Sequence, residues 1–181
     1  MTADKRVDVR DWHRQAFAEL EKLGIRQIGV VPDAGHSALM SLCQADGQMA
    51  IVPLTTEEEG IGLAAGAWFG GQRCALVMQS SGVGNCINML SLPLNYNLPL
   101  LMLVAMRGEW GEFNPMQVHA GRATPKILAE MGVIVERVDR DDEVAPAIAA
   151  MGGMCFNASR PVAILFGQRL IGAKNFREGA K

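Results

Sequence analysis

Three consecutive glutamates, Glu57, Glu58 and Glu59, are the residues whose type and spacing best suit proton chemistry in this sequence. They follow Thr55 and Thr56, each of which can cap a helix, and Glu58 and Glu59 stand three residues after them, as in a capping box. Carboxylates in a first helical turn also favour the positive end of the helix dipole. A solvated helix start is therefore the default interpretation of any one of them. The functional alternative is a carboxylate that shares a proton with a ligand.

A glycine-rich turn is the second candidate, with the sequence Ser80-Ser81-Gly82-Val83-Gly84-Asn85. Glycine permits a tight strand-to-helix connection and a close approach of a ligand to the backbone. The dinucleotide fingerprint G-x-G-x-x-G is incomplete, because Ile87 stands where the third glycine is expected. An ordinary tight turn and a binding loop both remain open from this pattern.

Two further residues have types that suit an anionic ligand. Arg107 follows an apolar segment, and a surface or interface ion pair is the alternative to a binding role. His36 follows the turn Pro32-Asp33-Ala34-Gly35 and can relay protons or bind a carboxylate, although a lone histidine is more often structural. The segment from Arg107 to Gly121 is predicted to be a long loop, and such loops are usually functional or mobile.

Apolar segments alternate with helix-like segments along the chain, and this alternation predicts the fold. Helices are expected over 8–23, 37–45, 57–67, 84–92, 123–131 and 141–152, and strands over 27–31, 49–54, 74–78, 99–105, 133–138 and 161–166. Such a pattern indicates an α/β protein with an open parallel sheet of about six strands and helices on both faces. We expect a single domain over 1–181, in which 168–181 form a loose or interface tail.

The carboxyl ends of parallel strands share one edge of a sheet, where ligands collect. That rule brings several candidates to one edge: Asp33, Gly35 and His36, then Thr55 to Glu57, then Gln79 to Asn85, and then Arg107. The helix expected over 57–67 is rich in glycine and alanine, which predicts a close approach of another backbone, helix or ligand.

Composition disfavours several classes of protein. The net charge is −2 and there is no Lys/Arg run, so nothing favours nucleic-acid binding. No stretch approaches the roughly 18 apolar residues of a membrane span, and the start does not resemble a signal peptide. The four cysteines lack CxxC spacing, which predicts buried thiols of a cytoplasmic protein rather than disulfides or a metal site.

Glu57 stands seven residues before Ala64 and nine before Gly66. Together with the following strand and the Ser-Gly-x-Gly-x-Asn turn, this register resembles the pyrimidine-binding domain of thiamine-diphosphate enzymes. Within that group, the segments 57–66, 78–88, 98–103, 106–108 and 121–124 resemble the alpha subunits of sulfopyruvate decarboxylases. Phosphonopyruvate decarboxylases are the family with the second strongest resemblance. The resemblance extends over the chain from roughly Ile25 to Phe166.

The resemblance implies a thiamine-diphosphate-dependent lyase that decarboxylates a small anionic 2-oxo acid. Sulfopyruvate is the expected substrate, with phosphonopyruvate or another 2-oxo acid as the alternative. It implies that Glu57 is catalytic and hydrogen-bonds the pyrimidine ring of the cofactor. The remaining expected site residues are Ser81, Gly82, Gly84 and Asn85 for the cofactor, His36 as a second catalytic residue, and Arg107, Gln117 and His119 for the substrate.

The resemblance also implies a partner chain. In this family a second domain holds the diphosphate and Mg²⁺ with Gly-Asp-Gly followed by Asn, whereas the nearest string here is Ala45-Asp46-Gly47 without a suitable Asn. A beta subunit that holds Mg²⁺ is therefore expected, in an alpha–beta hetero-oligomer. The alternative from a different functional class is a non-catalytic regulatory subunit whose pyrimidine-binding domain is degenerate. A nucleotide-binding module built on the Gly82 turn is a third reading.

Overall fold

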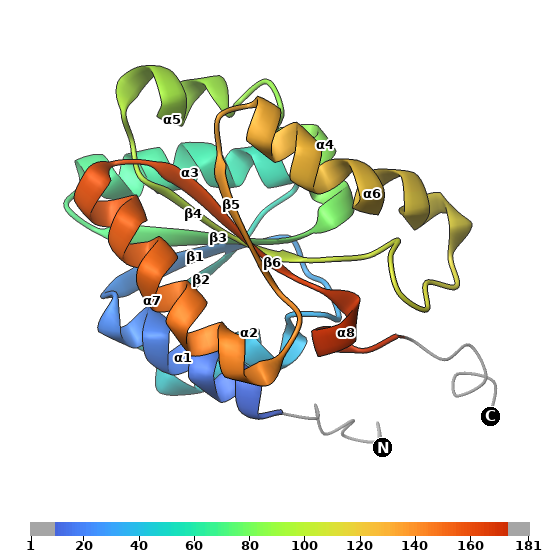
Figure 1. Ribbon diagram of the computed structural model, residues 1–181. Helices are drawn as coiled ribbons and strands as arrows, with labels where there is room; N and C mark the ends of the chain where they lie inside the picture. Colours follow the sequence, from blue (N-terminus) through green and yellow to red (C-terminus); the bar gives the residue numbers. More distant parts are fainter. Residues whose placement is uncertain (1–9, 174–181) are drawn as a thin grey trace.

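A parallel sheet of six strands runs through the computed structural model, which describes residues 10–173. The strands are β1 (Ile25–Val30), β2 (Ala50–Pro53), β3 (Arg73–Gln79), β4 (Leu100–Ala105), β5 (Ile134–Val138) and β6 (Pro161–Phe166). Their order is β2-β1-β3-β4-β6-β5, and every neighbouring pair is parallel (Figure 1). The predicted α/β architecture is confirmed.

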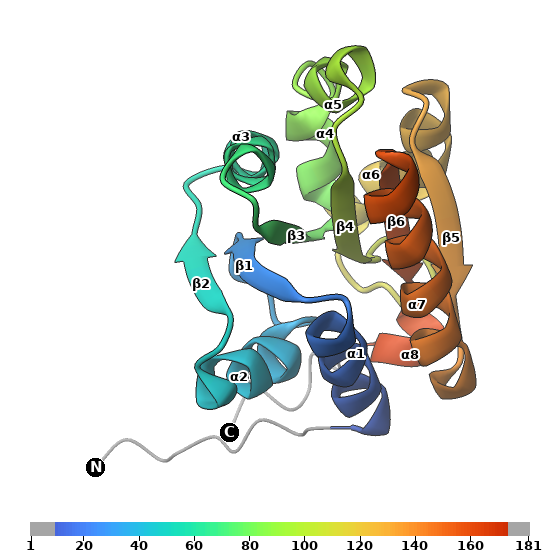
Figure 2. The ribbon, with the colours of Figure 1, turned by 90° about the vertical axis from the view of Figure 1, so that its left-hand side faces the viewer.

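Helices cover both faces of the sheet. On one face lie α1 (Asp11–Lys22), α2 (Ser37–Asp46) and α7 (Asp141–Ala158), and on the other lie α3 (Glu57–Phe69), α4 (Val83–Cys86), α5 (Ser91–Tyr96) and α6 (Pro115–Glu130) (Figure 2). Two short elements, η1 (Ser80–Gly82) and α8 (Gln168–Ile171), follow β3 and β6. Each face has its own cluster of buried apolar side chains, so the sheet separates two cores.

The central strands are buried on both faces, which explains their continuous apolar sequences. All six residues of β4 and all six of β6 are buried. The edge strands β2 and β5 have exposed positions. A parallel sheet covered by helices produces this contrast, because its edge strands are less covered than the strands at its centre.

Two predicted elements differ from the structure. The helix expected over 84–92 is divided into α4 and α5, and the glycine turn before it forms the helical turn η1. The loop expected over 107–121 ends at residue 114, because α6 begins at Pro115 and the Asn114 side chain accepts a hydrogen bond from the backbone N–H of Met116 (3.1 Å). Asparagine as the N-cap and proline at the first helical position are the usual signals of a helix start.

The ends of the chain lie partly outside the described residues. Positions 8 and 9 of the first predicted helix and residues 174–181 of the predicted tail are outside the range. Within that tail, α8 buries Gln168 and Leu170.

Helix α3 approaches β3 closely at Gly60. A β-carbon added to Gly60 would lie 2.2 Å from Cδ1 of Leu76 and 2.9 Å from Cδ1 of Leu54. At Gly62, on the exposed side of the same helix, an added β-carbon would meet no atom of the described residues within 4 Å. The expected close approach is therefore made at Gly60 by the side chains of the sheet and its flanking loop.

We expect Gly60→Ala and Gly62→Ala to change stability in opposite directions. The first forces extra volume into a packed core, which costs about 1–3 kcal/mol, and helix propensity returns only about 1 kcal/mol. Gly62→Ala gains about 1 kcal/mol of helix propensity, and its new methyl group meets no neighbouring atom in the described part of the chain. Urea unfolding of the two variants, followed by circular dichroism, measures both changes. A Gly60→Ala protein at least as stable as Gly62→Ala would contradict the close packing described above.

Candidate functional site

The structure distinguishes the three glutamates at the start of α3. Glu57 is 8% exposed, whereas Glu58 is half-buried and Glu59 is exposed. Glu59 accepts a hydrogen bond from the backbone N–H of Thr55 (2.8 Å), and Glu58 accepts one from the hydroxyl of Thr56 (2.8 Å). The carboxylates of Glu58 and Glu59 therefore stabilise the helix start, and the buried one of Glu57 is left for another role.

The carboxylate of Glu57 lies directly against the backbone of η1. A β-carbon added to Gly82 would lie 2.3 Å from Cδ of Glu57. The Asn85 side chain donates a hydrogen bond from Nδ2 to Oε2 of Glu57 (2.7 Å). Within residues 10–173, Oε1 has no hydrogen-bond partner. One oxygen is thus fixed, and the other can accept a proton or a hydrogen bond from a ligand.

Glu57 lies where the strand order reverses. The chain moves from β1 outward to β2 and then returns to β3 on the other side of β1. In α/β proteins, loops diverge at such a point and ligands bind outside the carboxyl ends of the strands; we call this position around Glu57 the crevice. Of the residues predicted to contact the cofactor here, Gly82 is buried, and Ser81, Gly84 and Asn85 are exposed. The predicted cofactor residues therefore lie together around Glu57.

A chain of polar side chains connects this crevice to the end of β4. Gln79 donates from Nε2 to Oγ of Ser81 (2.5 Å) and to Oε1 of Gln117 (3.1 Å). Its Oε1 accepts a longer bond from Nη1 of Arg107 (3.5 Å). The Ser80 hydroxyl accepts from the backbone N–H of Arg107 (3.0 Å). Arg107, which the order of the strands predicted to lie at this edge, is thus linked to Ser80 and Gln79. Gln117, which the resemblance suggested, joins them through Gln79.

Arg107 is already bound within the chain. Its Nε and Nη2 donate to the two oxygens of Glu112 at 2.7 Å each, and these side chains are 12% and 2% exposed. Glu112 also accepts from the backbone N–H groups of Gly108 and Asn114 and from Nε2 of Gln168, each at 3.0 Å. These hydrogen bonds, that from Arg107 above all, lower the pKa of Glu112 from 4.5 to about 2. The Arg107 charge is therefore compensated by a buried carboxylate.

A pocket of about 160 Å³ adjoins Arg107 at the same edge. It is lined by Arg10, Asp33, Ala34, Gly35, Arg107, Gln168, Ile171, Gly172 and Ala173. Asp33 accepts a hydrogen bond from the backbone N–H of Gly35 (2.6 Å), and Arg10 donates to the carbonyl of Leu170 (3.2 Å). Its wall carries the guanidinium groups of Arg10 and Arg107 and the carboxylate of Asp33, so it suits a small polar ligand. Arg107 is, however, already paired with Glu112.

His36 and His119 lie in different surroundings. The His36 ring is fully buried and packs edge-on against Phe166, with 5.8 Å between the ring centroids. Neither ring nitrogen has a hydrogen-bond partner in the described range, and burial lowers the pKa of this histidine to about 4. It is therefore neutral at physiological pH. His119 lies on the exposed side of α6.

Glu112 and Gln168 were missed by sequence reasoning. Gln168 is 2% exposed, and its Oε1 accepts from the backbone N–H of Glu109 (2.7 Å). It follows β6 directly, so the rule that selected residues after the first four strands would also have selected Gln168. No feature of the sequence marks Glu112 in the same way. Its partners are decided by the conformation of the segment after β4, which brings Glu112 to Arg107 and Gln168.

Other kinds of site were sought over residues 10–173. No group of three or more His, Cys, Asp or Glu side chains in that range could hold a metal ion. No helix in that range is long and apolar enough to cross a bilayer. All four cysteines are buried and unpaired, which confirms the prediction of buried thiols.

Comparisons with known proteins agree with this geometry. No protein-family model matches the sequence. The sulfopyruvate decarboxylase subunit alpha of Methanothermobacter thermautotrophicus is 35% identical over 156 residues, which cover 86% of this chain and 94% of that protein. The phosphonopyruvate decarboxylase of Streptomyces viridochromogenes is 30% identical over 169 residues, which cover 90% of this chain and 42% of that protein.

A solved structure shares the fold. A putative thiamin diphosphate-dependent enzyme from Mycobacterium smegmatis superimposes with a TM-score of 0.66 and 18% sequence identity. The match covers 88% of this chain and 31% of that one. The architecture of the sheet and helices is therefore one that occurs inside larger chains.

We expect the charge of Glu112 to stabilise the fold in a pH-dependent way. Its folded pKa of about 2 lies below the ordinary 4.5, so the stabilisation is complete above pH 4.5 and is lost as pH falls toward 2. A shift of that size corresponds to about 3 kcal/mol. Glu112→Gln should therefore lower the free energy of unfolding by about that amount at pH 7, and the gap to wild type should narrow below pH 4.5.

Urea unfolding between pH 7 and pH 2.5 measures that gap. Glu130→Gln is the matched control, because Glu130 is exposed on the last turn of α6. A gap for Glu112→Gln that stays constant over the whole pH range would show that the Glu112 charge does not contribute in this way.

Proposed function

The chain belongs to the family of sulfopyruvate decarboxylase alpha subunits, and we propose that it is the pyrimidine-binding subunit of a thiamine-diphosphate-dependent decarboxylase. The proposed reaction converts 3-sulfopyruvate into sulfoacetaldehyde and carbon dioxide. The similarity to the subunit from Methanothermobacter supports this assignment, because it extends over 94% of that protein. Phosphonopyruvate is the second candidate substrate, which the relative from Streptomyces favours.

The Glu57 carboxylate is the observation that carries the proposal. When bound, thiamine diphosphate supplies the electron sink for loss of carbon dioxide from a 2-oxo acid. Glu57 suits its pyrimidine ring, because Oε1 has no partner in the described range and can hydrogen-bond a ring nitrogen. Asn85 fixes the other oxygen, and Gly82 leaves the room that the carboxylate occupies. Burial in the crevice keeps water away from that proton.

The proposed substrate contacts lie along the polar chain from the crevice to the pocket. Arg107 borders both and can present Nη1, the nitrogen that makes only a 3.5 Å bond within the chain. Gln117 lies next to Arg107, because the Gln79 side chain hydrogen-bonds both of them. His36 is fully buried beneath the loop after β1, so its proposed catalytic role would be that of a neutral imidazole. For His119, a contact with substrate stays a prediction.

A beta subunit is proposed to hold the diphosphate and Mg²⁺. Residues 10–173 contain no cluster of metal ligands, so this part of the chain lacks the donors that such a group requires. The phosphonopyruvate decarboxylase relative aligns over only 42% of its length, so more than half of that protein has no counterpart here. An alpha–beta hetero-oligomer fits both observations. Free, buried cysteines fit a cytoplasmic protein.

The proposal is tested by purifying the chain together with its partner and measuring carbon dioxide release from sulfopyruvate, phosphonopyruvate and pyruvate. We expect turnover of sulfopyruvate that requires thiamine diphosphate, Mg²⁺ and both chains. A purified complex that binds no thiamine diphosphate and releases no carbon dioxide would point instead to a regulatory subunit.

Glu57→Gln is expected to lower turnover by at least about 100-fold, because an amide cannot share a proton with the ring nitrogen. The fold should be preserved, since glutamine has nearly the same shape. Glu58→Gln is the matched control on the next residue, where the carboxylate bonds only the Thr56 hydroxyl. Steady-state kinetics of both variants, with circular dichroism as a check of folding, decides the matter. Near-normal turnover in Glu57→Gln would rule out this role.

Gly82→Ala is expected to displace the Glu57 carboxylate, because the new methyl group would overlap it. A misplacement of about 1 Å can cost on the order of 100-fold in rate. Gly153→Ala on α7 is the control, since an added β-carbon there meets no described atom within 4 Å. We expect kcat to fall in Gly82→Ala and to stay unchanged in Gly153→Ala. Equal kcat values would show that the site tolerates a side chain at position 82.

A further inference from the structure

Large apolar side chains are exposed in the segment after β4 and on the first turn of α6. Trp110 is 53% exposed, Phe113 is 42% exposed, and Met116 is 79% exposed. Exposed apolar residues scattered singly are ordinary on a protein surface, whereas a group of them marks an interaction site. These side chains lie within seven consecutive residues at the carboxyl edge of the sheet, where the crevice is also found.

Several hydrogen bonds hold the backbone of this segment in place. Glu112, in its middle, is fixed by Arg107, by Gln168 and by two backbone N–H groups. A β-carbon at Gly121 of α6 would lie only 1.7 Å from the carbonyl oxygen of Arg107, so the helix packs directly on the start of the segment. A surface that is already ordered loses little entropy when a partner binds.

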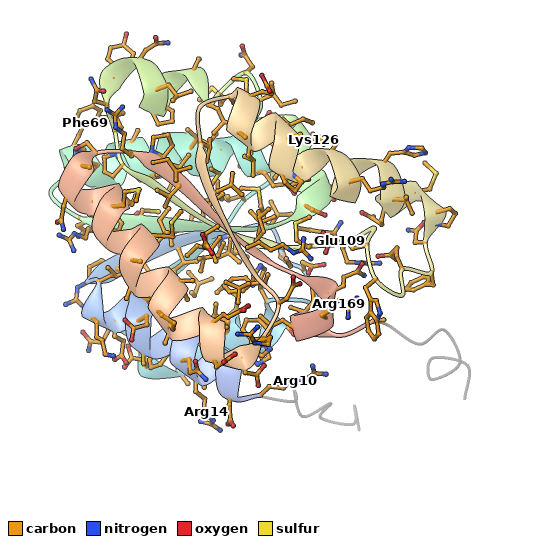
Figure 3. The ribbon with its side chains drawn as sticks, in the orientation of Figure 1. Arg10, Arg14, Phe69, Glu109, Lys126 and Arg169 are labelled. Atoms are coloured by element: carbon orange, nitrogen blue, oxygen red, sulfur yellow. The ribbon has the colours of Figure 1, made fainter. Side chains whose placement is uncertain are left out.

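Cations accompany the exposed apolar side chains. The guanidinium carbon of Arg169 lies 5.8 Å from the ring centroid of Trp110, and that of Arg107 lies 5.7 Å from the ring centroid of Phe113. Arg122 and Lys126 are exposed on α6, four residues apart and therefore on one side of the helix. Figure 3 shows Lys126 on this helix. The neighbouring acid Glu109 is bound by both Nη1 and Nη2 of Arg137. Arg107 is paired with Glu112. The cations that this surface offers are therefore Arg122, Lys126 and Arg169, on a chain whose net charge is −2.

The same edge is continuous with the crevice of Glu57. Gln117 follows Met116 on the first turn of α6, and its side chain accepts a hydrogen bond from Gln79. Gln79 also contacts Ser81, next to the glycine that covers Glu57. A chain that brings a diphosphate and Mg²⁺ to this crevice must therefore pass close to the exposed segment.

We propose that these residues form a docking edge for the beta subunit, and that the beta subunit meets it with an acidic and apolar surface. The docking edge consists of Trp110, Phe113, Met116, Arg122, Lys126 and Arg169. This inference rests on the proposed function, because it takes the partner to be the chain that holds the diphosphate. A second copy of this chain fits less well, since a two-fold contact would bring the same positive charges together.

The test compares assembly of the native complex for wild type and for Trp110→Ala, Met116→Asp and Arg122→Glu. Sedimentation of the recombined purified chains gives the dissociation constant. We expect each variant to weaken binding at least about tenfold, as exposed aromatic and arginine anchors do when they are buried at an interface. The loss for Arg122→Glu should shrink as salt is raised, because salt screens the charge pairing.

Phe69→Ala is the matched control. Phe69 is 76% exposed at the far end of α3, and Figure 3 shows it at the opposite end of the molecule from Glu109 and Arg169. It should assemble like wild type. Unfolding midpoints of all four variants should match wild type, since each altered side chain is exposed. Carbodiimide, which joins amines to carboxylates directly, should link Lys126 to acidic residues of the beta subunit.

Wild-type affinity in all three docking-edge variants, or cross-links from Lys126 confined to this chain, would overturn the proposal. A complex that assembles through this edge but decarboxylates no 2-oxo acid would count against the proposed function and leave the docking edge standing. A chain that purifies from its source cells with no partner would overturn both.

Discussion

The contact between the Glu57 carboxylate and the backbone at Gly82 is the constraint on which the rest of the site depends. A glutamate at the start of a helix would ordinarily extend into water, as Glu59 does. Glu57 is instead covered by η1, and no side chain larger than hydrogen fits between them. Asn85 then fixes one oxygen and leaves the other for a ligand. The close packing of α3 at Gly60 holds the helix at the depth where this contact forms.

A second buried carboxylate organises the other half of the edge. Glu112 joins the segment after β4 to the segment after β6, because it binds both Arg107 and Gln168. The same contacts form one wall of the pocket and keep the neighbouring aromatic side chains exposed. Buried charges are stable only when they are fully paired, and Glu112 meets that requirement with five donors. Pocket and docking edge are thus two consequences of one network.

The proposed division of the active site between two chains also accounts for what this chain offers and what it lacks. The crevice offers an acceptor suited to a ring nitrogen, and residues 10–173 offer no cluster suited to a metal-bound diphosphate. A partner that completes such a site must approach the carboxyl edge, where its contacts and the chemistry lie side by side. Assembly and catalysis then depend on the same segments, those that follow β3 and β4. This proximity explains why the proposed surface and the proposed site are joined through Gln79 and Gln117.

The sequence by itself determined the alternation of strands and helices, the edge that carries the candidates, and Glu57 as the glutamate in register. The alternation and the edge follow from local periodicity and from the order of elements, which a sequence records directly, whereas the choice of Glu57 follows from the resemblance to thiamine-diphosphate enzymes. Only the tertiary structure decided that Arg107 is paired with Glu112, that His36 is buried, and that Gln168, 56 residues beyond Glu112, binds it. It also divided the predicted helix over 84–92 and began α6 at Pro115. Such features depend on which side chains meet across the fold, and packing between distant segments leaves no periodic trace in the chain.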